Sequence, residues 1–238
     1  MGAVAATACG TGRGTEAGGD DVRDLHLAAG PMQVLAVGAH PDDVEIGCGG
    51  TLLTLRERPG VEVHCLVATA STERRLEAEH AVTAFNGPAA GIDFGDLPDS
   101  RLPDHWSAVK DFLEQAAHRR PSPDLVLAPR ADDSHQDHRL LAELVPTVWR
   151  DSLVLHYEIP KWDGDLGRVT HYVPLGDDLA RRKAELLTKV YPSQVGRDWW
   201  DDETFLAMMR LRGVECRARY AEGFLVQKAR LDLVRSDA

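Results

Sequence analysis

Residues 33–45 read QVLAVGAHPDDVE, and this stretch decides the fold. Its first six residues form a mostly apolar run that ends in Gly38, a pattern typical of a strand buried on both faces of a parallel sheet. The rest is a polar loop with one histidine and three acidic side chains. In open α/β sheets, ligands bind just beyond the carboxyl ends of the strands. The stretch therefore predicts an α/β protein with a polar site directly after its first strand.

The same succession of apolar segments and amphipathic segments continues along the chain. Besides residues 33–38, we expect strands over residues 61–69, 91–96, 124–129, 153–159, 169–173 and 222–228, the segment 169–173 being an edge strand. We expect helices over residues 47–58, 71–85, 105–119, 140–149, 179–190 and 204–212. Strands that alternate with helices predict a Rossmann-like, doubly wound α/β fold, in which a mostly parallel sheet carries helices on both faces.

Composition indicates an ordinary globular protein of 238 residues. We expect one domain over residues 31–238 and a poorly ordered tail, rich in glycine, alanine and threonine, over residues 1–30. The net charge of -11 argues against nucleic acid as a partner, and the sequence shows no membrane span and no secretory signal. The four cysteines form no CxxC pair, which favours a reduced, cytoplasmic protein. Whether the chain forms a homo-oligomer is left open.

A second polar cluster, DDSHQDH at residues 132–138, follows the strand predicted at 124–129. If the two strands are neighbours, their loops meet at one edge of the sheet. Catalytic zinc takes three histidine or carboxylate ligands and a water, although iron(II) and other divalent ions accept the same donors. Three ligands leave an acid and a histidine free for proton transfer. The residues expected to converge are His40, Asp42, Asp43, His135, Asp137 and His138.

Each cluster by itself is also compatible with a plain structure. His-Pro-Asp-Asp is an ordinary turn that leads into a helix, and a His-x-Asp-His run can lie on the surface of an acidic protein. Two such clusters, each at the end of a separate buried strand, favour a metal site over both of these interpretations. A dinucleotide site is excluded, because Leu52 stands where the fingerprint of residues 47–52 needs its last glycine.

The two motifs resemble those of the LmbE-like, or PIG-L, family of zinc N-deacetylases, which act on molecules that contain N-acetylglucosamine. AHPDDVE at 39–45 and HQDH at 135–138 match the family in order and spacing, and the resemblance extends from about residue 33 onward. It implies that zinc is bound by His40, Asp43 and His138 and that Asp42 is the general base. It further implies that a charged His135 stabilises the oxyanion and that Asp137 orients His135.

Weaker resemblances suggest substrate contacts. Arg74, three residues before Glu77, and Tyr191 and Gln194 of a Tyr-Pro-Ser-Gln run resemble family elements near the substrate, although an ion pair and a turn explain them equally well. The loop that begins at Thr69 lacks the glycine of the family pattern Thr-x-Gly-Glu, so substrate contacts there are not carried over.

The predicted function is that of a zinc-dependent hydrolase that removes an N-acetyl or related N-acyl group from a small molecule containing an amino sugar. A metal-dependent amidase or phosphoesterase, or a non-catalytic glycan-binding module, is the alternative. Trp199 and Trp200 suit either a sugar pocket or a protein contact, whereas His64 and His156 are expected to be structural. The resemblance implies three candidate substrate classes: GlcNAc-inositol precursors of low-molecular-weight thiols, GlcNAc lipids, and acetylated amino sugars of antibiotic pathways.

Overall fold

The computed structural model describes residues 22–27 and 29–232. Every predicted strand and helix is found there, with ends shifted by a few residues. The strands are β1 (Met32–Gly38), β2 (Val61–Val67), β3 (Gly91–Phe94), β4 (Leu125–Pro129), β5 (Leu153–Tyr157), β6 (His171–Leu175) and β7 (Tyr220–Leu225). The α-helices are α1 (Asp43–Arg56), α2 (Thr72–Asn86), α3 (Trp106–Arg119), α4 (Gln136–Val148), α5 (Asp177–Val190) and α6 (Asp202–Glu215), with short 3-10 helices η1 (Leu102–His105) and η2 (Pro192–Gln194).

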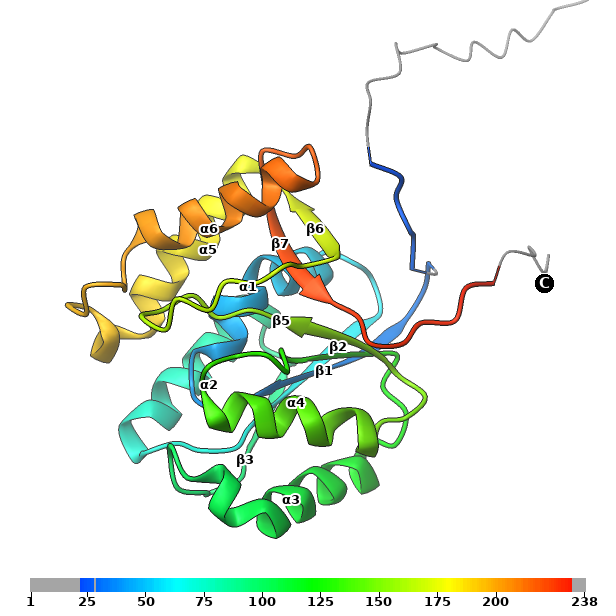
Figure 1. Cartoon of the computed structure of the whole chain (residues 1–238), viewed down its shortest axis with the longest axis vertical. Helices are drawn as coiled ribbons and strands as arrows, with labels where there is room; N and C mark the ends of the chain where they lie inside the picture. Colours follow the sequence, from blue (N-terminus) through cyan, green and yellow to red (C-terminus); the bar gives the residue numbers. More distant parts are fainter. Residues whose placement is uncertain (1–21, 28, 233–238) are drawn as a thin grey trace, which may run out of the picture.

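The seven strands form one sheet in the order β3-β2-β1-β4-β5-β7-β6 (Figure 1). The first five of these are parallel, and β7 runs antiparallel to both β5 and β6. The predicted mostly parallel α/β fold is thereby confirmed, and β6 lies at an edge as expected.

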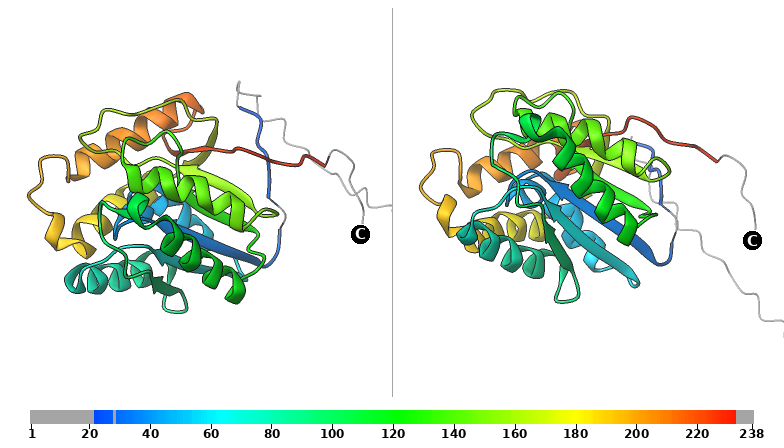
Figure 2. Two further views of the ribbon diagram at one scale, coloured as in Figure 1. Left: turned by 60° about the horizontal axis from the view of Figure 1, so that its bottom comes forward. Right: turned by 90° about the horizontal axis from the view of Figure 1, so that it is seen from below.

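The helices cover both faces of the sheet (Figure 2). Along β1, Val34 and Ala36 belong to the core beneath α1, α2 and α5, whereas Leu35 and Val37 belong to the core beneath α3 and α4. This alternation follows from the two-residue period of a strand, and burial of both faces explains why the segment is apolar throughout.

β1 and β4 are neighbours, with Val34 opposite Leu125 and Ala36 opposite Leu127. The chain leaves β1 for α1 on one face and leaves β4 for α4 on the other. The strand order therefore reverses between them, and a crevice opens at their carboxyl ends. Both polar clusters predicted to converge lie at this crevice.

The glycines at the start of α1 allow the helix to pack closely on its neighbours. A Cβ atom on Gly47 would lie 2.1 Å from the Tyr157 ring, and one on Gly49 would lie 2.7 Å from Phe85. The helix is kinked at Cys48, and Glu222 accepts hydrogen bonds from the backbone amides of Gly50 and Thr51 beyond the kink. These glycines thus serve packing, as expected once a dinucleotide site was excluded.

Part of the expected tail lies outside the described residues, namely 1–21 and 28, and so does Cys9. Residues 22–27 have no regular secondary structure. Cys48, Cys65 and Cys216 are free thiols. Among the described residues, no helix combines the length and hydropathy that a membrane span needs. One domain over residues 31–238 stays a prediction.

Candidate metal centre

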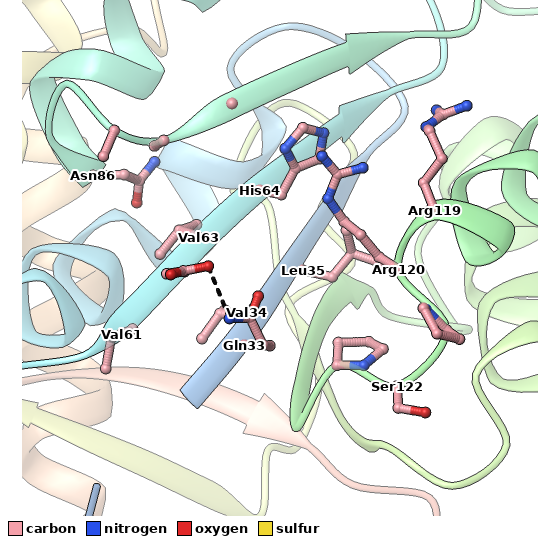
Figure 3. Close-up of a pocket in the computed structure, with 16 residues that line it drawn as sticks. Gln33, Val34, Leu35, Val61, Val63, His64, Asn86, Arg119, Arg120 and Ser122 are labelled. Carbon is pink, nitrogen blue, oxygen red and sulfur yellow. Dashed lines mark hydrogen bonds between the residues drawn. The ribbon is translucent and has the colours of Figure 1, made fainter. Parts of the chain in front are cut away.

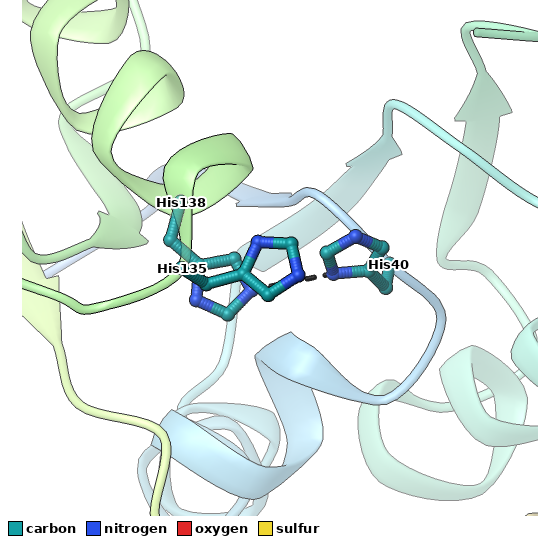
Figure 4. Close-up of side chains that lie close together, drawn as sticks. All are labelled: His40, His135 and His138. Carbon is teal, nitrogen blue, oxygen red and sulfur yellow. Dashed lines mark hydrogen bonds between the residues drawn. The ribbon is translucent and has the colours of Figure 1, made fainter. Parts of the chain in front are cut away.

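Three side chains converge where β1 and β4 end. Nδ1 of His40 lies 3.3 Å from Oδ2 of Asp43 and 3.3 Å from Nε2 of His138, and that Nε2 lies 3.2 Å from Oδ2 of Asp43. His40 comes from the loop after β1, and His138 lies in the first turn of α4 (Figure 4). Asp43 is the first residue of α1. The three donor atoms therefore form a nearly equilateral triangle.

This triangle fits a tetrahedral metal ion. With metal–ligand distances of ~2.0–2.2 Å, two ligands of tetrahedral zinc stand ~3.3–3.6 Å apart. Two imidazole nitrogens and a carboxylate oxygen are also the donor set expected of a catalytic zinc site. Asp43 is held in place because its Oδ2 accepts hydrogen bonds from the backbone amides of Ala39 and His40, at 2.9 and 2.8 Å.

Carboxylates contact the second nitrogen of each imidazole. Nδ1 of His138 lies 2.9 Å from Oδ2 of Asp133, and Nε2 of His40 lies 3.2 Å from Oδ2 of Asp137 and 3.1 Å from Oδ1 of Asp99. Asp133 and Asp137 are buried. A proton shared with these acids leaves Nε2 of His138 and Nδ1 of His40 free to bind a metal, the usual arrangement around metal-bound histidine.

Asp42 lies beside this triangle in an unusual backbone conformation. Its φ of 101° is rare for any residue other than glycine, and such strain is often retained at functional sites. Burial raises the pKa of Asp42 to about 7, although the neighbouring Arg74 guanidinium opposes the rise. A carboxylate with a pKa near the working pH is suited to general-base catalysis.

His135 caps the amino end of α4. Its Nδ1 accepts a hydrogen bond from the backbone amide of Asp137 at 3.2 Å, so the neutral ring carries its proton on Nε2. Burial, together with the charges of His138, His40 and Lys161, lowers the pKa of His135 to about 4. The ring is therefore neutral at pH 7, and the expectation of a charged His135 is corrected. A neutral Nε2–H remains a hydrogen-bond donor.

The role expected of Asp137 changes as well. Its carboxylate contacts His40 through Oδ2 and accepts the backbone amide of Leu102 on Oδ1 at 3.0 Å. Only its backbone amide reaches the His135 ring. Asp137 therefore orients His40, because α4 starts at Gln136 and its first turn directs this side chain toward β1 rather than back to His135.

A cavity of about 700 Å³ opens onto these residues and is lined by His40, Asp42, Asp43 and His135. Arg74 and Gln194 also line it. Tyr191 does not: it is fully buried, and its hydroxyl donates to Glu45 at 2.8 Å. The expected contact of Tyr191 with substrate is therefore corrected to a structural role. Its ring instead lies beneath the Arg74 guanidinium, at 5.0 Å.

Several site residues were missed by sequence reasoning. Asp133, which contacts His138, stands inside the cluster DDSHQDH, so its position in that motif was the available signal. Asp99 and the loop residues Lys161 and Trp162 line the cavity, but nothing in the sequence connects them with the two motifs. Of the two adjacent tryptophans, Trp199 lines the cavity while Trp200 is buried in the core.

Neither of the histidines expected to be structural lines the metal-site cavity. Nδ1 of His156 donates to the carbonyl of Pro129 at 2.8 Å. His64 belongs to a second cavity of about 680 Å³, at the amino ends of the strands (Figure 3). Arg119 and Arg120 of this cavity both face the carboxylate of Asp93, as does His64.

Comparison with known proteins assigns the first half of the described fold. The PIG-L family, GlcNAc-PI de-N-acetylase, matches the chain over residues 35–149. These residues belong to the PIG-L family. The match includes the second half of β1 and all of α1, β4 and α4, and with them both motifs of the candidate centre. The chain is also similar to the uncharacterized deacetylase YaiS of Escherichia coli strain K12, with 28% identity over 137 residues, which cover 53% of this chain and 74% of YaiS.

Solved structures extend the likeness of fold beyond the PIG-L segment. N,N'-diacetylchitobiose deacetylase from Pyrococcus horikoshii has a TM-score of 0.65 at 24% identity, over 82% of this chain and 84% of that one. The zinc-inhibited form of teicoplanin deacetylase Orf2 has a TM-score of 0.65 at 16% identity, over 82% and 97% of the two chains. The fold therefore continues past residue 149, where the family match ends.

Arg74 of the PIG-L segment should lower the pKa of Asp42, the residue expected to be the general base. Its Nη2 lies 2.5 Å from Oδ2 of Asp42, and this positive charge holds the carboxyl pKa below the value that burial alone would produce. In Arg74→Gln the pKa of Asp42 should rise, so the acid limb of the kcat/KM profile should move to higher pH. Arg75→Gln is the matched control, because Arg75 pairs with Asp96 instead. Equal profiles for the two variants would contradict this role.

Glu45 of the same segment should destabilise the metal-free protein at alkaline pH. Burial raises the pKa of Glu45 to about 7, against the hydrogen bond from Tyr191. Because the pKa of Glu45 in the folded protein exceeds its ordinary value of 4.5, the folded protein loses stability as pH rises from that value through about 7. Glu45→Gln should therefore increase the free energy of unfolding at pH 8 by up to about 3 kcal/mol, and the gain should vanish toward pH ~4.5.

Urea unfolding of chelator-treated protein at several pH values measures this gain. The exposed Glu79 on α2 offers a matched control, and Glu79→Gln should leave the pH dependence unchanged. A destabilised Glu45→Gln variant at pH 8 would show that the carboxylate is ionised and useful there.

Proposed function

We propose that the protein is a metal-dependent N-deacetylase that acts on an amino-sugar-containing small molecule. The observation that carries this proposal is the triangle of His40, Asp43 and His138, in which each imidazole has its second nitrogen on a carboxylate. Histidines that bind a divalent metal usually donate the proton of their second ring nitrogen to a carboxylate, which is the arrangement found here. Zinc is the ion that this donor set suits best, with iron(II) as an alternative.

The metal, when bound, supplies Lewis acidity and a water of lowered pKa. Asp42 would remove a proton from the attacking water, a role supported by its position beside the triangle and by burial, which raises its pKa to about 7. The neutral Nε2–H of His135 would donate a hydrogen bond to the carbonyl oxygen as negative charge develops on it. The proton held by Asp42 can then pass to the departing nitrogen, which leaves acetate and a primary amine as products.

Arg74 and Asp137 act through other residues. Arg74 donates to the carbonyl of Pro41 and to Asp42, so it fixes the strained loop that presents the base. Asp137 fixes the His40 ring. Both are positioning residues, and their loss should change the geometry of the centre rather than remove a reacting group.

The proposed substrate class rests on the family match and on the names of related enzymes. The family is described as a GlcNAc-PI de-N-acetylase, and one protein of similar fold is a deacetylase of N,N'-diacetylchitobiose. The cavity of about 700 Å³ falls in the size range of small-molecule sites, which is ~300–1,000 Å³.

Incubation of metal-loaded protein with a panel of N-acetylated amino sugars tests the proposal. We expect stoichiometric release of acetate and primary amine, abolished by a chelator and restored by zinc. Hydrolysis of a phosphate ester but of no amide would favour a phosphoesterase. Glycan binding without acetate release would favour the non-catalytic module.

A further inference from the structure

Two tryptophans form part of the cavity wall outside the segment that matches the family. Trp162 lies in the loop after β5, and Trp199 lies between η2 and α6. Their rings are 5.7 Å apart at an angle of 73°, and both line the same cavity as Asp42 and His135. Trp162 is 59% exposed even with the Arg197 guanidinium 5.9 Å from its ring. An indole ring exposed beside a catalytic cavity is available for stacking.

Two buried arginines hold the loop that carries Trp162. Arg130 donates to the carbonyl of Asp165, and Arg212 donates to the carbonyl of Gly167 at 2.9 Å. Glu158 pairs with Arg212 at 2.6 and 2.7 Å and lies 3.7 Å from Arg130, so one carboxylate ties the two anchors together. The side chain of Asp165 also accepts the backbone amide of Ser134 at 2.7 Å. The loop is therefore fixed against the strand β4 and the helix α6.

The tryptophan rings are fixed as well. Nε1 of Trp162 donates to Oδ1 of Asp198 at 2.7 Å, which joins its loop to the segment that carries Trp199. Trp199 contacts Trp200 edge to face at 5.3 Å, and the buried Trp200 packs in the same way on Phe205 at 5.2 Å. Rings held in this way lose little conformational entropy when a ligand stacks on them.

We infer that Trp162 and Trp199 form a subsite for the aglycone, the part of the substrate beyond the acetylated sugar. This inference rests on the proposed deacetylase function. The ligand chemistry it requires is a second ring with an apolar face, which either a pyranose or an aromatic group provides. The substrate is accordingly an N-acetylated amino sugar in glycosidic linkage, not the free monosaccharide, and Trp162 determines that preference.

Steady-state kinetics of the metal-loaded full chain test the subsite with three substrates: N-acetylglucosamine, N,N'-diacetylchitobiose and p-nitrophenyl N-acetyl-β-glucosaminide. In Trp162→Ala we expect KM for the two glycosides to rise about tenfold with kcat little changed, since stacking adds to binding and not to the chemical step. The parameters for N-acetylglucosamine should not change, and Trp162→Phe should restore most of the loss.

Trp106→Ala is the matched control, because Trp106 is 46% exposed on α3 but does not line the cavity. It should leave all three substrates unaffected. An effect of Trp162→Ala confined to chitobiose would identify the second ring as a sugar, and one confined to the nitrophenyl glycoside would identify it as aromatic. Both outcomes support the subsite. Equal changes for all three substrates, or none, would overturn it.

Failure of the proposed function would be recognised separately. If the wild-type protein hydrolyses none of the three compounds, calorimetric titration with the two glycosides still measures the subsite. Weaker binding to Trp162→Ala than to wild type would then support the inference, and equal binding would overturn it.

Discussion

Replacement of His138 by alanine should remove the metal from the protein. Its side chain is fully buried, and its Nε2 lies 3.2 and 3.3 Å from the other two donors of the triangle. Loss of an outer partner of a metal ligand costs ~10–100-fold in affinity, so loss of a ligand itself should exceed about 100-fold. Elemental analysis after dialysis against a weak chelator measures the metal content per chain.

His135→Ala is the matched variant from the same motif. The imidazoles of His40, His135 and His138 lie close enough together to bind one metal ion. His135 is therefore the alternative to Asp43 as the third ligand. Because Nδ1 of His135 accepts a backbone hydrogen bond, we expect His135→Ala to keep the metal while losing turnover. Metal retention in His138→Ala, or metal loss in His135→Ala, would contradict the ligand set proposed above.

Replacement of Asp42 by asparagine should leave metal content intact and reduce kcat by ~10²–10⁴-fold, the usual contribution of a general base. Asparagine keeps the shape of the side chain and, like aspartate, tolerates a positive φ, so the loop at 101° should persist. The pH profile provides an independent measurement. Activity of the wild-type protein should rise with pH as Asp42 ionises, and this acid limb should be absent from the variant.

Asp99→Asn is the control for Asp42→Asn. Asp99 also lines the cavity, but its carboxylate is 71% exposed and contacts Nε2 of His40, which Asp137 also contacts. We therefore expect kcat of Asp99→Asn to fall by less than about tenfold and its pH profile to retain the acid limb. If Asp42→Asn kept wild-type turnover, another group would have to be the base.

The order of elements was readable from the sequence. Continuous apolar runs predict buried strands and amphipathic segments predict helices, because burial on one or both faces leaves a periodic trace along the chain. The two motifs were equally readable, since both directly follow such runs. Element ends were less well predicted: α4 begins at Gln136 instead of residue 140, because the His135 side chain caps it and no such cap was foreseen.

The pairing of β1 with β4 is a tertiary fact, and the site depends on it. The pattern of apolar residues predicts that each strand is buried, but it does not predict which strand lies beside it. Convergence of the clusters AHPDDVE and DDSHQDH therefore depended on the strand order, in which β1 lies beside β4. The same holds for Trp162, which lines the cavity together with residues of the two motifs that are distant from it in sequence.

The residues of AHPDDVE and HQDH were thus determined by the sequence, whereas their partners were decided by the fold. Sequence reasoning assigned a charge to His135 and the orienting role toward it to Asp137. In the structure burial keeps His135 neutral, and the first turn of α4 directs Asp137 to His40. Protonation and hydrogen-bond partnership depend on what surrounds a side chain in space, and the surroundings of a buried group are supplied by the whole chain.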